Sequence, residues 1–180
     1  LMATGMPWLW PARQPMVKLL RKRKCSDRWA ELGGVCLSAR EQGLFRLVYK
    51  STSNIELAGN PFRNAILDIL DWSQSYNPEH GITGALMVSN GHFAQVLEGE
   101  RDIIRALYGN VACDPRHRFP TLLQFEAAEA RFFESWSMAF VDEERQQKVP
   151  LSARPAGSDP SHSSVSADGI LSLLQFLVRD

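Results

Sequence analysis

The chain has 180 residues, 44% of them apolar and 22% charged, and its twenty basic and twenty acidic side chains balance. This composition is close to the average of globular domains and excludes wholesale disorder and collagen-like structure. No stretch approaches the ~20 consecutive apolar residues of a membrane-spanning helix. Because the net charge is zero, no global field attracts a nucleic acid. We therefore expect neither a transmembrane segment nor a nucleic-acid partner.

The charge is unevenly spread along the chain. Residues 1–43 carry eight Lys or Arg and three acidic residues, a net charge of +5, and include the basic run Arg21–Lys24. Apolar residues there follow no sustained period, so we expect a basic N-terminal extension that is poorly ordered. A basic arm for an acidic partner or a lipid is the alternative.

The three cysteines, Cys25, Cys36 and Cys113, include no closely spaced pair. So sparse a set indicates neither a disulfide scaffold nor a zinc site. It fits a reducing compartment, and we expect a cytoplasmic protein.

The region 44–141 begins with a strand and a helix. Residues 44–51 alternate their apolar and polar side chains, which predicts the strand. The helix is expected from Asn60, which can cap it, to about Asn77, and Pro61 suits its first position.

A hairpin follows, with strands at 82–89 and 92–98 around the dipeptide Asn90-Gly91, the strongest short hairpin signal. Gly99 is expected to end the second strand. The remaining expected elements are a helix over 101–113, ended by Asp114-Pro115, and strands over 121–129 and 136–140.

The order βαββαβ with an extra fifth strand predicts an α+β fold of the ferredoxin-like type, in which two helices cover one face of a mostly antiparallel sheet. Residues 142–166 include a Pro-, Ser-, Ala- and Gly-rich stretch and predict a linker. Beyond it, Ser166 can cap a final helix within 167–180 that is apolar nearly all round. Such a helix must be buried, and we expect it on the other face of the sheet, with binding to a partner as the alternative.

Several polar residues continue otherwise apolar stripes. Taken singly, most have a local explanation, since a residue at a helix end can cap it and a tyrosine can be a core residue with a wet hydroxyl. Gln95 is harder to explain in this way, because a mid-strand amide has no backbone-capping role. Together the set would converge on a cleft with apolar walls, which suits a flat heterocycle carrying donors and acceptors. The residues are Ser73 and Asn77 on the first helix, Asn110 and Asp114 on the second, and Tyr49 and Gln95 on strands.

Motifs of the common enzyme classes are missing. The chain has no Gly-rich phosphate loop, no HExxH and no GxSxG, and its four histidines are dispersed. Aromatic and basic residues do not interleave as they do in proteins that bind single-stranded nucleic acid. We therefore predict no catalytic residues and no metal site.

Six short segments follow one another in order within 44–141. They are LVYKS at 47–51, SQSYN at 73–77, GITGAL at 81–86, GHFAQVLEG at 91–99, DPRH at 114–117 and WSM at 136–138. In this order and spacing they resemble the BLUF family of blue-light sensors that use FAD. The resemblance covers over half the chain and implies the ferredoxin-like fold expected above, with FAD between the two helices.

The resemblance also implies a switch. Tyr49 matches the family's light-active tyrosine and Gln95 its switching glutamine. Trp136 and Met138 match the strand-five pair whose alternative placements accompany signalling, and Ser73 matches a hydroxyl close to that tryptophan.

Further residues are implied to hold the cofactor. Asn77 matches the asparagine that holds the polar edge of the flavin, and Asp114 an acid near the ring. Arg116 and His117, in the DPRH segment, are further cofactor-binding candidates. Asn110 departs from the family, several members of which place an arginine or another larger polar residue there.

The family mechanism implies that excited flavin takes an electron from Tyr49 and then a proton through Gln95. Recombination then leaves the Gln95 amide rotated or tautomerised, and an amide suits this task because its two ends have opposite hydrogen-bonding roles. Because the chromophore is not consumed, the resemblance implies a photoreceptor and not an enzyme. At 180 residues we expect no attached effector domain, so the signal would pass to a separate downstream protein.

Two other classes of function stay open as alternatives. A small acylphosphatase-like hydrolase would need an anion-binding loop with an arginine after the first strand, and residues 51–59 contain none. A flavin-free interaction module is the other alternative. A homo-oligomer is compatible with all of these interpretations.

Overall fold

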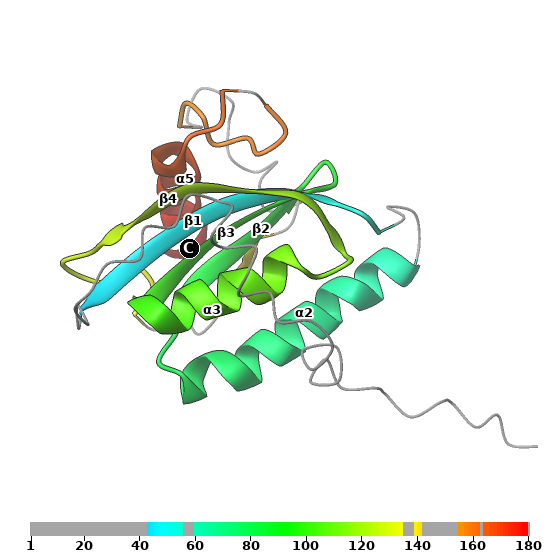
Figure 1. Cartoon of the computed structure of the whole chain (residues 1–180). Helices are drawn as coiled ribbons and strands as arrows, with labels where there is room; N and C mark the ends of the chain where they lie inside the picture. Colours follow the sequence, from blue (N-terminus) through cyan, green and yellow to red (C-terminus); the bar gives the residue numbers. More distant parts are fainter. Residues whose placement is uncertain (1–42, 56–59, 135–138, 142–154, 163, 180) are drawn as a thin grey trace, which may run out of the picture. The chain divides into compact units, whose positions relative to one another are not determined.

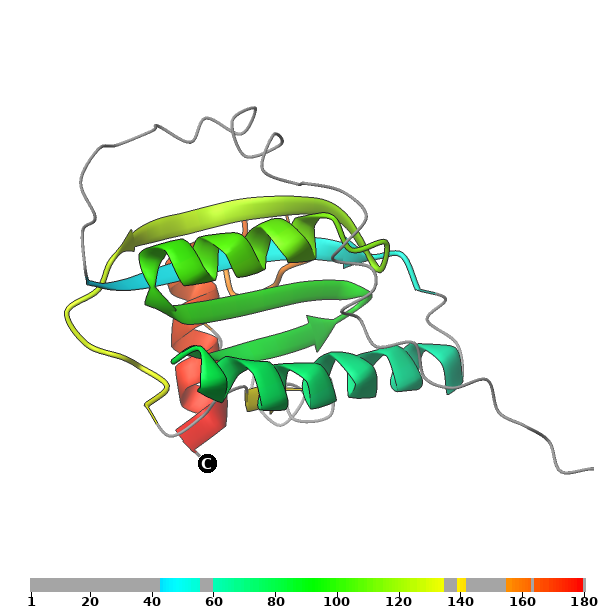
Figure 2. The same cartoon turned by 60° about the horizontal axis from the view of Figure 1, so that its bottom comes forward.

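The computed structural model describes residues 43–55, 60–134, 139–141, 155–162 and 164–179, all within the unit Cys36–Asp180. Its elements are β1 (Leu44–Ser53), α2 (Asn60–Glu79), β2 (Thr83–Ser89), β3 (His92–Glu100), α3 (Arg101–Ala112), β4 (His117–Ala127), β5 (Ala139–Val141) and α5 (Ala167–Arg179). The strands form one sheet in the order β4-β1-β3-β2-β5, antiparallel except where β5 runs parallel to β2. Helices α2 and α3 lie on one face and α5 on the other (Figure 1 and Figure 2). The predicted α+β, ferredoxin-like arrangement is confirmed.

The turn between β2 and β3 sets the register of the central hairpin. Asn90 and Gly91 both have a positive φ, 49° and 73°, as the primed two-residue turns of hairpins require. Ser89 therefore pairs with His92 across the turn. The Asn-Gly signal predicted this hairpin, and the prediction is confirmed.

Alternation along β1 and β3 gives the sheet two different faces. Tyr49 pairs with Gln95, and the Tyr49 ring contacts Tyr108 of α3. Val48 and Val96, each next to one of this pair in the chain, point the other way and join the core under α5. Alternate residues of β1 and β3 therefore face opposite sides of the sheet: those in line with Tyr49 and Gln95 face α2 and α3, and those in line with Val48 and Val96 face α5.

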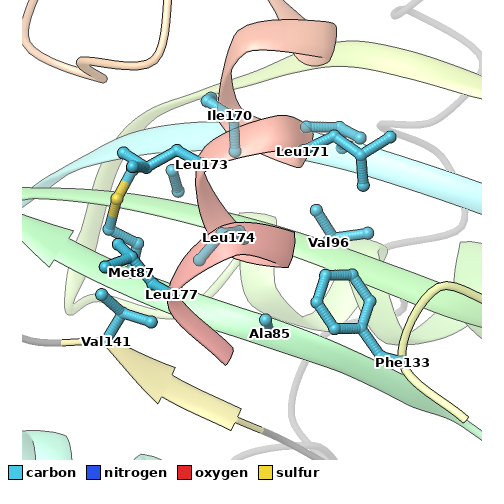
Figure 3. Packing of buried hydrophobic residues seen from close by; sticks show 12 residues of the cluster. Ala85, Met87, Val96, Phe133, Val141, Ile170, Leu171, Leu173, Leu174 and Leu177 are labelled. Atoms are coloured by element: carbon cyan, nitrogen blue, oxygen red, sulfur yellow. The ribbon is translucent and has the colours of Figure 1, made fainter. Parts of the chain in front are cut away.

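Helix α5 covers the second face through one apolar core. Ser166 Oγ accepts a hydrogen bond of 3.1 Å from the backbone N–H of Gly169, which caps the helix as predicted. Burying one leucine is worth about 1.5–3 kcal/mol, so the apolar side of α5 stabilises this docking, and the predicted position of the helix is confirmed. The core joins Ile170, Leu171, Leu173, Leu174 and Leu177 to Ala85, Met87, Val96, Phe133 and Val141 (Figure 3).

The prediction that Gly99 ends the third strand is wrong. β3 continues through it, and Gly99 pairs with Phe45 of β1. A Cβ at this position would lie 3.1 Å from Cγ2 of Ile104. The glycine therefore permits the close approach of α3 to the sheet, which no local sequence signal shows.

Other boundaries differ from the prediction by a few residues, and two of these differences have a clear cause. Helix α2 continues through Pro78 to Glu79, because the fixed φ of proline is compatible with the last helical turn. Strand β4 begins at His117, four residues earlier than predicted, because β1 extends far enough for Ser53 to pair with it.

The described part of the predicted linker packs against the sheet. Residues 155–162 form turns in which Ser158 and Pro160 are buried. Lys50 Nζ of β1 donates to the carbonyl oxygens of Pro160 at 3.5 Å and His162 at 3.4 Å. This part of the chain is therefore attached to the sheet ahead of α5.

The predicted basic extension (1–42) and the beginning of the linker (142–154) lie outside the described residues. In the part of the chain that is described, no helix combines the length and the apolar character needed to cross a membrane.

Candidate functional site

The centre of the site is a hydrogen bond between two neighbouring strands. Tyr49 and Gln95 are register partners on β1 and β3, and only 1% and 6% of their surfaces are exposed. The Tyr49 hydroxyl donates to Oε1 of Gln95 at 2.5 Å. Burial raises the pKa of Tyr49 well above its usual value, so the phenol keeps its proton at neutral pH. The sequence placed both residues on inward strand faces, and the structure brings them into contact.

Aromatic rings from α3 and β4 surround the Tyr49 ring. Tyr108 lies with its ring centroid 5.2 Å from that of Tyr49, and His117 with its centroid 6.5 Å away. Phe93 of β3 also packs against His117, with the ring centroids 4.6 Å apart. Tyr108 was missed by the sequence prediction because its apolar ring fits the buried helical spacing. Tyr108 follows Ile104 by one helical turn and therefore lies on the face of α3 toward the sheet, and this spacing could have identified it as a site residue.

His117 is neutral at physiological pH. Burial lowers its pKa to about 4; the Asp114 carboxylate opposes this shift, and the Arg116 guanidinium adds to it. His117 Nδ1 lies 2.7 Å from Ser51 Oγ, so the ring is fixed by a hydrogen bond to β1. The histidine implied by the DPRH segment thus stands beside the Tyr49–Gln95 pair as an uncharged polar group.

Asp114 and Arg116 form a local unit after α3. Asp114 Oδ1 accepts from the backbone N–H of Arg116 at 2.9 Å, and Oδ2 accepts from its Nη2 at 2.5 Å. Burial would raise the pKa of Asp114, but the hydrogen bonds and charge of Arg116 outweigh it and lower the pKa. The Asp114 side chain thus stabilises the turn around Pro115, which is the local role that the sequence left open for it, while the C-cap of α3 itself is Cys113.

The α2 side of the site carries two buried polar residues. Ser73 and Asn77 lie one helical turn apart on the same face of α2, and Asn77 is 0% exposed. The Asn77 backbone oxygen accepts from the N–H of Ile82 at 2.8 Å, where the chain turns from α2 toward β2. Asn110, one turn before Asp114, is half-buried on α3. The structure therefore places all three on the helices that lie over the Tyr49 face of the sheet.

Trp136 and Met138 lie outside the described residues, so their roles stay predictions. The described residues of β5, which follow them in the chain, lie in register with the switch pair. Gln95 is the register partner of Leu86 in β2, and Leu86 that of Phe140 in β5. A single row across the sheet therefore leads from Gln95 to β5.

Comparison with known proteins agrees with this geometry. A family profile described as "Sensors of blue-light using FAD" (BLUF) matches residues 44–139. The chain is 30% identical over 123 residues to the photoactivated adenylate cyclase subunit beta of Euglena gracilis, across 67% of this chain and 14% of that protein. It is 33% identical over 66 residues to the blue light- and temperature-regulated antirepressor BluF of Escherichia coli K12, across 37% of this chain and 16% of that protein.

A solved structure shows the same fold. The dark-state structure of BlrB, a BLUF protein, superposes with a TM-score of 0.63 at 26% identity, over 77% of this chain and 98% of that one. The chain spans only 14% of the length of the curated cyclase subunit that it matches. Profile, sequence and fold nevertheless agree over the region that carries the Tyr49–Gln95 pair. The chain belongs to the BLUF family.

Proposed function

We propose that this protein is a blue-light photoreceptor that binds FAD beside the Tyr49–Gln95 pair, on the face of the sheet that α2 and α3 cover. The observation that carries the proposal is the buried hydrogen bond from the Tyr49 hydroxyl to Gln95 Oε1. It joins an oxidisable phenol to an amide whose two ends can exchange donor and acceptor roles.

The polar residues around the pair fit a flavin. An isoalloxazine ring has carbonyl oxygens and ring nitrogens along one edge and an apolar body, so its site needs amides and hydroxyls set among apolar and aromatic side chains. Asn77 and Ser73 supply an amide and a hydroxyl from α2, both buried. Gln95 supplies a second amide from the sheet, while Asn110 and the Asp114–Arg116 unit lie at the α3 side.

When bound, FAD would supply the absorption of blue light and the electron acceptor. Tyr49 would be the electron donor, and its phenolic proton would leave along its hydrogen bond to Gln95. Both the electron and the proton would return to Tyr49 afterwards, so that electrons and protons balance over the cycle. The lasting change would be a Gln95 amide that is rotated or tautomerised and hydrogen-bonded differently.

Because Tyr49 and the cofactor would return to their starting redox states, no substrate would be consumed, and we propose that the protein is not an enzyme. The acylphosphatase-like alternative is disfavoured because residues 51–59, after β1, contain no arginine to hold an anion. A flavin-free interaction module would leave the buried Tyr49–Gln95 pair without a function.

The proposed organisation keeps the boundaries expected from the sequence. Residues 44–141 form the sensor, 1–43 an extension, 142–166 a linker and 167–180 the terminal helix. Two relatives are named as a cyclase subunit and an antirepressor, so related sensors serve different outputs. We propose that this chain relays its signal to a separate protein in the cytoplasm.

The test is the absorption spectrum of the purified protein in the dark and under blue light. We expect a yellow protein with a structured flavin spectrum, extractable FAD, and a small, reversible red shift on illumination. A protein that stays colourless after reconstitution with FAD would contradict the proposal. A flavin spectrum without a red shift would leave binding in place but refute the switch.

A further inference from the structure

A buried carboxylate lies on the reverse side of the strand that carries the switch. Glu98 follows Gln95 by three residues on β3, so the two side chains point to opposite faces of the sheet. Glu98 is 0% exposed. Its Oε1 accepts from Nε of Arg46, its register partner on β1, at 2.7 Å.

Besides Arg46, the carboxylate accepts a long hydrogen bond of 3.5 Å from Thr83 Oγ1 and shorter ones from backbone groups of the segment that leads to β5. The N–H of Phe132 donates to Oε2 of Glu98 at 3.0 Å, and that of Phe133 at 3.2 Å. Arg46 adds a bond from Nη2 to the carbonyl oxygen of Ala130 at 2.9 Å, and its guanidinium lies 3.8 Å from the Phe132 ring centroid. We refer to residues 130–133 as the anchor segment.

A second arginine also holds the anchor segment against the sheet. Arg131, within the anchor segment, donates from Nη1 to Thr83 Oγ1 at 2.8 Å and to the carbonyl oxygen of Glu98 at 2.9 Å. Its Nη2 donates to the carbonyl oxygen of Gly81 at 2.7 Å. The anchor segment is thus fixed to β3 and to the beginning of β2 by charged groups.

The anchor segment connects the two regions through which a light signal would pass. Phe133 is fully buried in the core under α5 (Figure 3). Ala139 begins β5 a few residues later, and Phe140 in that strand is in register with Leu86 and, through it, with Gln95. One end of this stretch is therefore held by Glu98, and the other lies in the row that starts at the switch.

We propose that Glu98 is a positioning residue of the light response: it fixes the anchor segment, so that a change at Gln95 is transmitted to β5 and α5. The inference rests on the proposed function. The physical reason is stiffness, because a buried carboxylate with an ion pair and two backbone N–H donors resists displacement. Without this carboxylate, the anchor segment would shift together with β5, and the displacement would not be passed on to the core under α5.

The test compares Glu98→Gln with Glu100→Gln in the full chain loaded with FAD. Glu100 lies two residues further along β3, is exposed and makes no side-chain capping bond, so it is a matched control. Absorption reports the red shift, and hydrogen exchange in the dark and under continuous blue light reports the backbone.

We expect both variants to keep the red shift. In Glu98→Gln the amides of residues 132–133 should exchange about tenfold faster in the dark, as expected when bonds to a charged group are lost. The light-minus-dark difference over 167–178 should fall to less than half of the wild-type value, while Glu100→Gln keeps it. A merely structural role would change exchange equally in both states and leave that difference intact.

An unchanged difference in Glu98→Gln would overturn the proposal, and so would loss of its red shift, since Glu98 would then act at the switch itself. A wild-type protein with a red shift but no light effect over 167–178 would also overturn it. A wild type without a red shift would refute the proposed function. If Glu98→Gln does not fold, Arg131→Gln is the deciding variant. It removes the bonds from Arg131 to Thr83 and to the carbonyl oxygens of Gly81 and Glu98, but leaves the Glu98 carboxylate paired with Arg46, and it must show the same loss.

Discussion

Tyr49 and Gln95 illustrate how burial prepares a residue pair for a proton-coupled change. Burial raises the pKa of Tyr49, so the hydroxyl is protonated and donates in the resting state. An oxidised phenol is far more acidic, so loss of an electron reverses this preference and drives the proton toward the bonded amide. The same geometry that stabilises the resting state therefore directs the proton once the electron has left.

The first prediction concerns this pair. Tyr49→Phe keeps the ring and Gln95→Leu keeps a similar volume, so both variants should fold and bind flavin. Each should lose the red-shifted state, because one lacks the donor and the other the amide. Tyr76→Phe is the control: this α2 tyrosine stacks between Trp72 and His80. An ordinary red shift in Tyr49→Phe would show that the tyrosine is misassigned.

The second prediction concerns His117 and pH. Its folded pKa of about 4 lies below the value of 6.5 for a free histidine, so below pH 6.5 the unfolded chain binds the proton more readily. The stability contributed by neutral His117 is therefore complete above pH 6.5 and is lost as the pH falls toward 4, by at most about 3 kcal/mol.

Chemical denaturation of the flavin-loaded protein between pH 4 and pH 7 checks this. His117→Gln retains a group that can hydrogen-bond Ser51 but does not titrate, so its stability should depend less steeply on pH. His162→Gln, at an exposed position, should behave as the wild type does. Equal slopes in all three proteins would show that His117 is not the responsible group.

The site was predicted from sequence in part. Tyr49 and Gln95 were found because alternation places them on inward faces, and the resemblance then gave them roles. The Glu98 network was not found, because nothing local to Glu98 shows that Arg46 lies opposite it. That pairing follows from the register between β1 and β3, which are separated by a helix and a strand.

At the scale of elements, local signals predicted what is determined locally. The Asn90-Gly91 turn fixed the hairpin, and the apolar surface of α5 required burial on the free sheet face. The wrong predictions concern non-local contacts: β3 continues through Gly99 because Phe45 of β1 pairs with it, and β4 begins early because Ser53 of β1 pairs with His117. Where a strand begins and ends depends on its pairing partners in the sheet, and local sequence patterns do not show which residues these are.

The third prediction concerns the close packing of β2 on β3. A Cβ on Gly84, where φ is +157°, would lie 2.0 Å from the carbonyl oxygen of Val96. Since that neighbour is backbone, it cannot move aside, and Gly84→Ala should lose stability at the upper end of the ordinary range, about 3 kcal/mol. Gly109→Ala in α3 meets nothing within 4 Å and should gain about 0.5–1 kcal/mol. Urea denaturation of both variants checks this, and similar stabilities would contradict the predicted clash.

At the scale of the molecule, β3 joins the two sides of the sheet. Gln95 points to the proposed flavin side, while Ala94 and Val96 lie in the core under α5. A change at Gln95 therefore acts on a strand whose neighbouring side chains share one apolar core with α5. A shift of about 1–2 kcal/mol would change the docked population of α5 severalfold to tenfold or more.

The last prediction tests whether this docking is the variable part of the response. Leu174 of α5 is fully buried against the sheet. Leu174→Ala should reduce the stability by about 2–5 kcal/mol, because the strands beneath the side chain cannot move to close the cavity. The α5 amides should then exchange faster in the dark, while the red shift persists, since Leu174 lies on the face opposite Tyr49. Phe176→Ala, at a position 53% exposed, should change stability by less than about 0.5 kcal/mol. Equal α5 protection in Leu174→Ala and wild type would show that α5 is held by other contacts, and a lost red shift would show that the two faces are not separable.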